Sequence, residues 1–397
     1  GNNYQSNPIE HTTFTNNALR ASVYYNEKLN ARHTFRTGVI AHQIGYDFAY
    51  QYYNSQEKLW KNVISSTGNT QFYQAYLQWK SRLADKLTLI GGVHGSYLAL
   101  NGKYSIEPRA SLVYQLNNSK ISLAAGLHSK PEHISTYMFQ NTAQGAANTY
   151  PNKNLDLLRA FHGVAGYDVT VLKKLRIKTE VYYQKLYNIP VEKDAASGFS
   201  IINAENIYSL LETKQPLVSE GTGENYGIDL SIERPFANGY YVLATGSLFT
   251  STYTNYAGDR YNTRYNRGHQ VNIIAGKEFK LNANGKSIIG LNGKILYSGG
   301  LRESKIDTDA SILNGKQMIV PGQFFTEKAP YYFRADASIY YKKNGRKSTH
   351  TVQLDVQNLS NRENYFFSYF DSKNGMVKRV NQLGIIPTIS YRIDFHW

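Results

Sequence analysis

The last residues of the chain, Thr388–Trp397 with the sequence TISYRIDFHW, alternate between apolar and polar side chains. Successive side chains of a β-strand point to opposite faces, so this pattern predicts one strand with an apolar side and a polar side. The apolar side carries Ile389, Tyr391, Ile393, Phe395 and Trp397. Transmembrane β-barrels need strands of about 9–11 residues with lipid on one side and a polar lumen on the other. A single strand of this kind also fits a soluble β-sandwich, so the rest of the chain must decide.

Similar segments recur from one end of the sequence to the other. Residues 175–184 (LRIKTEVYYQ) and 333–341 (FRADASIYY) show the same period of two, and no stretch shows a helical period. The pattern predicts about fifteen strands, near residues 14–26, 33–50, 70–83, 86–100, 105–116, 119–129, 156–172, 175–190, 222–235, 239–253, 268–280, 286–301, 331–343, 348–360 and 383–397.

The predicted connections alternate between short and long, with one exception, the short connection at Asn101–Tyr104. Three of the short ones contain Asn-Gly pairs, Asn238-Gly239, Asn284-Gly285 and Asn344-Gly345, which suit tight hairpin turns. The long ones cover residues 51–69, 130–155, 191–221, 254–267, 302–330 and 361–382. Outer-membrane barrels have short periplasmic turns and longer extracellular loops, whereas a soluble sandwich has no reason to separate loop lengths by side. The connections therefore favour a transmembrane antiparallel β-barrel.

The composition agrees with a barrel. The 397 residues include 34 Tyr, 31 Gly and 17 Phe but no Cys, and the mean hydropathy of −0.48 looks like that of a soluble protein. Alternation hides the hydrophobicity of a barrel, and Tyr is expected in the aromatic girdles at the two membrane interfaces. The net charge of +15 is spread over scattered Lys and Arg residues without a dense basic stripe, so we expect no nucleic-acid partner.

The strand count bears on the extent of the barrel. Bacterial single-chain barrels close with even numbers of strands, and an open sheet edge in lipid leaves backbone groups without hydrogen-bond partners. An odd number of strands therefore predicts that further strands, before residue 1 or in another chain, complete the barrel. We expect residues 1–397 to be one barrel domain that forms the C-terminal portion of a larger protein.

Several segments resemble TonB-dependent outer-membrane receptors. They include residues 106–117 (IEPRASLVYQLN), 154–192, 221–249 (GTGENYGIDLSIERPFANGYYVLATGSLF), 266–279, 333–345 and 354–366 (LDVQNLSNRENYF). The terminal strand is similar to the insertion signal of bacterial outer-membrane proteins, which the barrel-assembly machinery recognises. Together these segments cover almost the whole chain.

The resemblance implies a 22-stranded barrel with a plug in its lumen, of which this chain holds about the last fifteen strands and not the plug. It also implies a location in the outer membrane of a Gram-negative cell and uptake of a scarce nutrient: a siderophore, haem, cobalamin, an oligosaccharide or a peptide. Energy would come from TonB, acting through an N-terminal region outside this chain. Outer-membrane lipid and a surface lipoprotein are further partners that the resemblance suggests, and it implies no enzyme activity and no cofactor.

In such receptors extracellular loops capture the ligand, and loops longer than about 12–15 residues are usually functional or disordered. We therefore predict ligand contacts in the loops 130–155, 191–221 and 302–330. Tyr137, Phe139, Tyr150, Phe324 and Phe325 would supply stacking surface, with Arg302 and Lys305 as charged partners.

Two other classes of barrel stay open from the residues alone. A passive porin would lack a plug and close with about 16–18 strands. An outer-membrane barrel hydrolase would need a nucleophile and a base near the rim, but the sequence contains no HExxH, GxSxG or glycine-rich phosphate loop. His128, His133 and His162 are not spaced as ligands of a defined metal site, so we predict no metal centre.

Overall fold

The computed structural model describes residues 10–54, 58–140, 149–172, 174–204 and 216–396. In this part of the chain fifteen strands pair in sequence order, each antiparallel to its neighbours, and one short strand is added beside β10. The fifteen strands are β1 (Glu10–Lys28), β2 (His33–Asn54), β3 (Leu59–Ala84), β4 (Leu87–Leu98), β5 (Lys103–Gln115), β6 (Ser119–Lys130), β7 (Leu158–Val171), β8 (Leu175–Glu192), β9 (Leu217–Ala237), β10 (Tyr240–Thr254), β12 (His269–Lys280), β13 (Ser287–Ser298), β16 (Tyr332–Asn344), β17 (Ser348–Gln357) and β20 (Ile386–Phe395). The added strand is β11 (Arg260–Asn262).

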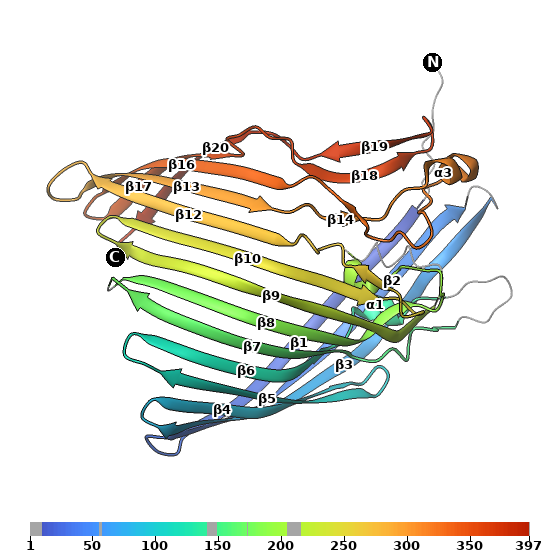
Figure 1. The fold of residues 1–397 in the computed structure, drawn as a ribbon, viewed down its shortest axis with the longest axis horizontal. Coiled ribbons are helices and arrows are strands. Elements are labelled where there is room, and N and C mark those ends of the chain that lie inside the picture. The colour runs from blue at the N-terminus through green and yellow to red at the C-terminus, as the bar shows by residue number, and fades with distance from the viewer. Residues whose placement is uncertain (1–9, 55–57, 141–148, 173, 205–215, 397) are drawn as a thin grey trace.

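The sheet curls into the wall of a barrel, with tight turns at one end and most of the longer connections at the other (Figure 1). The predicted count of fifteen strands and the all-β barrel class are confirmed. Among the described residues, β1 pairs only with β2 and β20 only with β17, so this wall is a partial barrel. At Asn238-Gly239 both residues have positive φ (57° and 81°), as the predicted hairpin turn requires.

The two faces of the wall differ as the alternation predicts. The outer face carries a continuous belt of exposed apolar side chains that meet across the strands, for example Leu354 between Ile339 and Ile389. Ile389, Tyr391, Ile393 and Phe395 all lie on this face and are between 39% and 77% exposed, whereas Trp397 lies outside the described residues. Such a belt is what a lipid environment requires. No helix among the described residues is long and apolar enough to cross a membrane.

One predicted loop is wrong. Residues 51–69 were expected to form a long connection, but β2 and β3 continue as a paired hairpin as far as Asn54 and Leu59. This part of the hairpin extends beyond the length that a strand needs to span the membrane. Its residues therefore do not have to alternate between apolar and polar side chains. Its polar run Ser65–Thr70 therefore looked like a loop while forming regular strand pairs.

The remaining long connections carry short elements of their own. These are α1 (Ile134–Tyr137), η1 (Ile201–Asn203), β14 (Arg302–Glu303), α3 (Thr308–Asn314), β15 (Glu327–Lys328), β18 (Tyr365–Asp371) and β19 (Met376–Asn381). β14 pairs with β15 and β18 with β19, in two small sheets separate from the wall. We call the described residues of the connections after β6, β8, β10, β13 and β17 the loop layer.

Candidate functional site

The loop layer has a hydrophobic core of its own beneath the long β2–β3 hairpin. Residues from β2, β3, β4, the connection after β6 and the start of β9 form it: Phe48, Val63, Ile64, Phe72, Leu98, Ile134, Tyr137, Met138, Phe139, Leu155, Leu157 and Leu217. α1 is capped at its N-terminus by His133, whose Nδ1 accepts a hydrogen bond from the Ser135 amide at 3.3 Å. The four residues of α1 place the Tyr137 side chain in this core.

Three of the predicted ligand contacts lie in or against this core. Tyr137 is fully buried, its hydroxyl accepts a hydrogen bond from the Glu132 amide at 3.2 Å, and burial raises the pKa of Tyr137 to about 12. Phe139 is buried as well. Tyr150 is half-buried against the core, and its hydroxyl accepts a hydrogen bond from Gln140 Nε2 at 3.2 Å. In this conformation Tyr137 and Phe139 hold the loop together instead of offering stacking surface, and their contact with a ligand stays a prediction.

The other predicted aromatic residues join two different loops. The ring of Phe324 meets Tyr261 edge-on at 5.5 Å, and that of Phe325 meets Tyr253 at 6.2 Å. Phe324 also lies directly on the backbone of Gly198, where a Cβ atom would collide with its ring. The Tyr253 hydroxyl donates a hydrogen bond to the Gly198 carbonyl at 2.5 Å. The connection after β13 is therefore held against the connection after β8.

The two predicted cations have different surroundings. Arg302 lies in β14, and its guanidinium donates hydrogen bonds to the carbonyl oxygens of Asn266 at 3.3 Å and Thr326 at 3.2 Å. Arg302 thus connects the segment around Asn266 with the segment around Thr326 in the loop layer. Lys305 is exposed and follows β14 in the same loop. The predicted residues therefore gather in two places, the core around Tyr137 and the contact of the connection after β13 with the connection after β8. Beside the first core, the Leu217 amide donates to Asn152 Oδ1 at 2.8 Å and so joins the connection after β6 to the start of β9.

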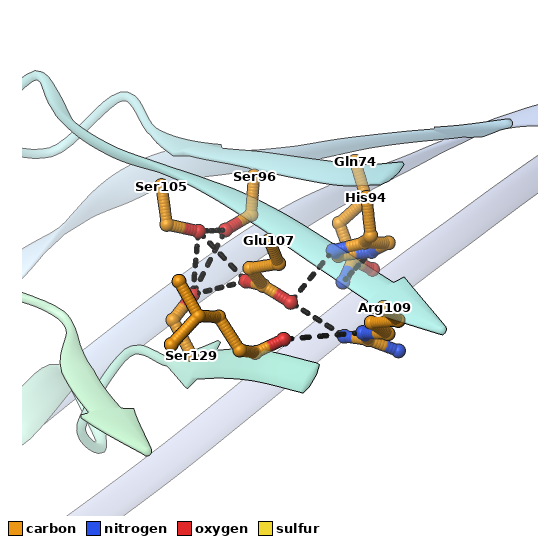
Figure 2. A network of polar contacts seen from close by, with 8 residues as sticks. Gln74, His94, Ser96, Ser105, Glu107, Arg109 and Ser129 are labelled. Carbon is orange, nitrogen blue, oxygen red and sulfur yellow. Dashed lines mark hydrogen bonds and ion pairs between the residues drawn. The ribbon is translucent and has the colours of Figure 1, made fainter. Parts of the chain in front are cut away.

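A polar network inside the barrel wall was not predicted. Glu107 of β5 is 1% exposed, and Ser105 Oγ at 2.7 Å and Ser129 Oγ at 2.5 Å both donate to its Oε1. His94 Nδ1 lies 3.1 Å and Arg109 Nη2 2.5 Å from the other carboxylate oxygen, as Figure 2 shows. The signal in the sequence is the alternation of residues 104–109, which places these polar groups opposite Tyr104 and Ile106.

This network lies where a strand ladder stops. The pairing of β5 with β6 ends at Arg109 and Gly126, next to Pro108, which has no amide hydrogen to donate. Beyond this point Arg109 Nε donates instead to the Leu127 carbonyl at 3.2 Å. Side chains from β4, β5 and β6 therefore replace the missing backbone hydrogen bonds and keep the wall joined (Figure 2).

Beside the network, the inner face of the wall is hollowed by a cavity of about 540 Å³. His94, Arg109, His128 and His162 line it, and the rings of His128 and His162 lie 4.5 Å apart on neighbouring strands. His133 is elsewhere, 5.7 Å from Phe48. No group of three or more side chains able to hold a metal ion occurs in the described part of the chain.

The comparisons with known proteins agree with this architecture. The family described as TonB dependent receptor-like, beta-barrel matches residues 1–359. The chain belongs to the TonB-dependent receptor family. Receptors of this family are outer-membrane transporters and not enzymes, and they bind small ligands such as siderophores. This receptor chain is therefore an outer-membrane protein.

Solved structures of other receptors have the same fold. The ferric yersiniabactin uptake receptor FyuA from Yersinia pestis matches 98% of this chain with a TM-score of 0.67 and 15% identity, over 55% of its own length. The pyoverdine receptor FpvA from Pseudomonas aeruginosa matches 97% with a TM-score of 0.65 and 14% identity, over 54% of its length. The ferric-catecholate import receptor Fiu from E. coli K12 matches 97% with a TM-score of 0.62 and 13% identity, over 55% of its length. The chain thus spans about half the length of these receptors. No match is found among curated proteins.

Proposed function

We propose that this chain is the C-terminal part of the barrel of an active importer. The importer takes up a scarce nutrient through the outer membrane with energy coupled through TonB. The observation that carries the proposal is the family barrel, matched over residues 1–359, with a packed layer of loops at one end. Long loops over the mouth of a barrel suit capture of a ligand before transport.

The proposal includes parts beyond this chain. The edge of β1 has no partner among the described residues, and an unpaired edge is untenable in lipid. Further barrel strands and an N-terminal plug would complete the transporter, and the plug region would bind TonB. The barrel-assembly machinery would insert the protein, and a surface lipoprotein is a further partner to test.

The polar inner wall supports the same function. The cavity beside the buried Glu107 network is lined by Arg109 and three histidines, so a plug or a passing ligand would meet hydrogen-bonding groups there. The nutrient remains to be chosen among a siderophore, haem, cobalamin, an oligosaccharide and a peptide. The ligands named for FyuA, FpvA and Fiu make a ferric siderophore the first of these to test.

The experiment is uptake by cells that produce the full-length protein. Each candidate nutrient is supplied as the limiting source, with and without TonB and with and without an uncoupler of the proton gradient. We expect uptake of one nutrient to collapse in both treatments, while entry of a small sugar through general porins is unchanged. Uptake that continues in both treatments would support the passive porin instead.

A further inference from the structure

A second cavity, of about 440 Å³, lies at the loop end of the inner wall. It is bounded by β12, β13 and β16 and by the hairpin β18–β19. Its polar lining includes Arg267, Gln270, Asn272, Tyr332, Tyr365 and Gln382, and no Asp or Glu is among its lining residues. The cavity therefore contains one permanent charge, the guanidinium of Arg267.

Arg267 differs from other arginines of the inner wall. Arg109, Arg176 and Arg334 each pair with a carboxylate at 2.5 to 2.8 Å. Arg267 is half-buried, and its Nη1 donates to the Ser298 hydroxyl at 2.9 Å. Within the described ranges no carboxylate lies at ion-pairing distance from Arg267. Burial lowers the pKa of Arg267, which reflects the cost of a charge that is partly removed from water without an opposite charge.

A carboxylate outside the lining contacts one of the lining residues and is already engaged. Tyr365, which lines the cavity, donates its hydroxyl to Glu303. Burial and this hydrogen bond raise the pKa of Tyr365 to about 12, so the phenol stays neutral at physiological pH. The lining of the cavity therefore carries one charged side chain, Arg267, among neutral hydrogen-bonding amides and phenols.

An exposed aromatic ring also borders the cavity. Phe366 lines the same cavity and is 51% exposed, with its ring 5.1 Å from that of Phe367. A guanidinium offers several donors in a planar fork, which suits carboxylate, catecholate and phosphate oxygens, and an exposed ring suits a second planar group.

We propose that the Arg267 cavity binds an anionic oxygen group attached to a planar ring of the transported nutrient. Arg267 would hold the anion, Gln270, Asn272 and Gln382 would donate or accept neutral hydrogen bonds, and Phe366 would contact the ring. The inference rests on the proposed function, since it names the class of ligand that the importer takes. It favours an anionic ring-bearing nutrient over a neutral oligosaccharide.

The test is equilibrium binding to the full-length protein in detergent, with benzoate, its neutral analogue benzamide and inorganic phosphate as probes. We expect benzoate to bind more tightly than benzamide by about tenfold or more, as for a charge-assisted hydrogen bond. Arg267→Gln should remove this preference, Arg267→Lys should keep part of it, and Phe366→Ala should weaken benzoate but not phosphate. Arg346→Gln, at an exposed turn at the opposite end of the wall, is the matched control and should bind as the unmodified protein does.

Equal binding of benzoate and benzamide, or unchanged benzoate binding by Arg267→Gln, would overturn the inference. Heat-dependent mobility on gels shows that each variant is a folded barrel. The conservative Arg267→Lys and the separate Phe366→Ala keep the test informative if Arg267→Gln does not fold. Binding does not need TonB. If Arg267 binds benzoate but uptake is unchanged without TonB, this inference stands and the proposed active importer is rejected.

Discussion

A charge placed on the outer face of β16 tests the orientation of the whole wall. Ala337 faces outward between Gly293 and Val356, whereas the next residue, Ser338, faces inward between Asn292 and Asp355. We expect Ala337→Arg to destabilise the barrel strongly and Ser338→Arg to be tolerated. The two positions have the same depth and differ only in the face they occupy.

The depth follows from the outward-facing aromatic residues Tyr331 and Tyr341, which are 48% and 40% exposed and lie on either side of Ala337. At about 3.4 Å per residue and a tilt of about 40°, the distance between them along the membrane normal is about 26 Å. This matches an apolar belt of about 25 Å and places Ala337 within about 3 Å of its centre.

An arginine at the middle of the belt costs about 2–4 kcal/mol, which changes the folding equilibrium by about 30- to 900-fold. At the inner position, Asp355 offers the new arginine an opposite charge, so we expect a change below about 1 kcal/mol. Ile393→Arg tests the outer face near the interface, because Ile393 lies near the turn end of β20, where a charge costs about 0–1 kcal/mol.

The measurement is equilibrium unfolding of the full-length protein in lipid vesicles, followed by tryptophan fluorescence. If Ala337→Arg and Ser338→Arg lower the free energy of unfolding equally, the assignment of outer and inner faces is incorrect. If Ile393→Arg is as harmful as Ala337→Arg, the depth derived from the two tyrosines is incorrect.

Two further predictions concern the loop layer. Burial raises the pKa of Glu132 above 4.5, so the contribution of Glu132 to stability is greatest below pH 4.5 and is lost as the pH rises through the folded pKa. Glu132→Gln should therefore slow hydrogen exchange in residues 130–140 at pH 7 but not near pH 4.5. Equal exchange rates at pH 7 would contradict a buried carboxylate at this position. Gly198→Ala should push the Phe324 ring away and speed hydrogen exchange in residues 320–328 several-fold. In a protein that already carries Phe324→Ala, the same substitution should add little, because the two changes act on one contact. Additive effects of the two substitutions would argue against that contact.

Most of the wall could be predicted from the sequence because lipid imposes a simple rule. Every membrane-spanning strand must present apolar side chains outward, so stretches such as residues 333–341 show their faces directly. The rule ends at the membrane surface. Residues 51–69 were mistaken for a loop because a paired hairpin in water can carry serine, threonine and glycine on either face.

The loop layer was harder to predict for a related reason. Tyr137 lies in a core assembled from its own connection and four strands distant in sequence, and no local pattern shows that these segments meet. The Arg267 cavity could not be predicted because its residues come from three separate strands and a hairpin. Whether an arginine has a carboxylate partner depends on which residues the fold brings next to it, and the sequence does not show this. The polar residues around Glu107, in contrast, can be recognised in the alternating sequence of residues 104–109. The sequence does not show that they meet where the pairing of β5 with β6 ends.

The cross-links within the loop layer bear on how receptors of this kind can diversify. The wall pairs only neighbouring strands, so a connection can be lengthened or replaced without disturbing it. The connections themselves are not independent, because Phe324 rests on Gly198 and the Leu217 amide is bound by Asn152. Exchange of a single loop between related receptors would leave cavities and unpaired groups in the others. New specificity is therefore expected to be inherited as a block of loops, with compensating changes at these contacts, on a wall that stays the same.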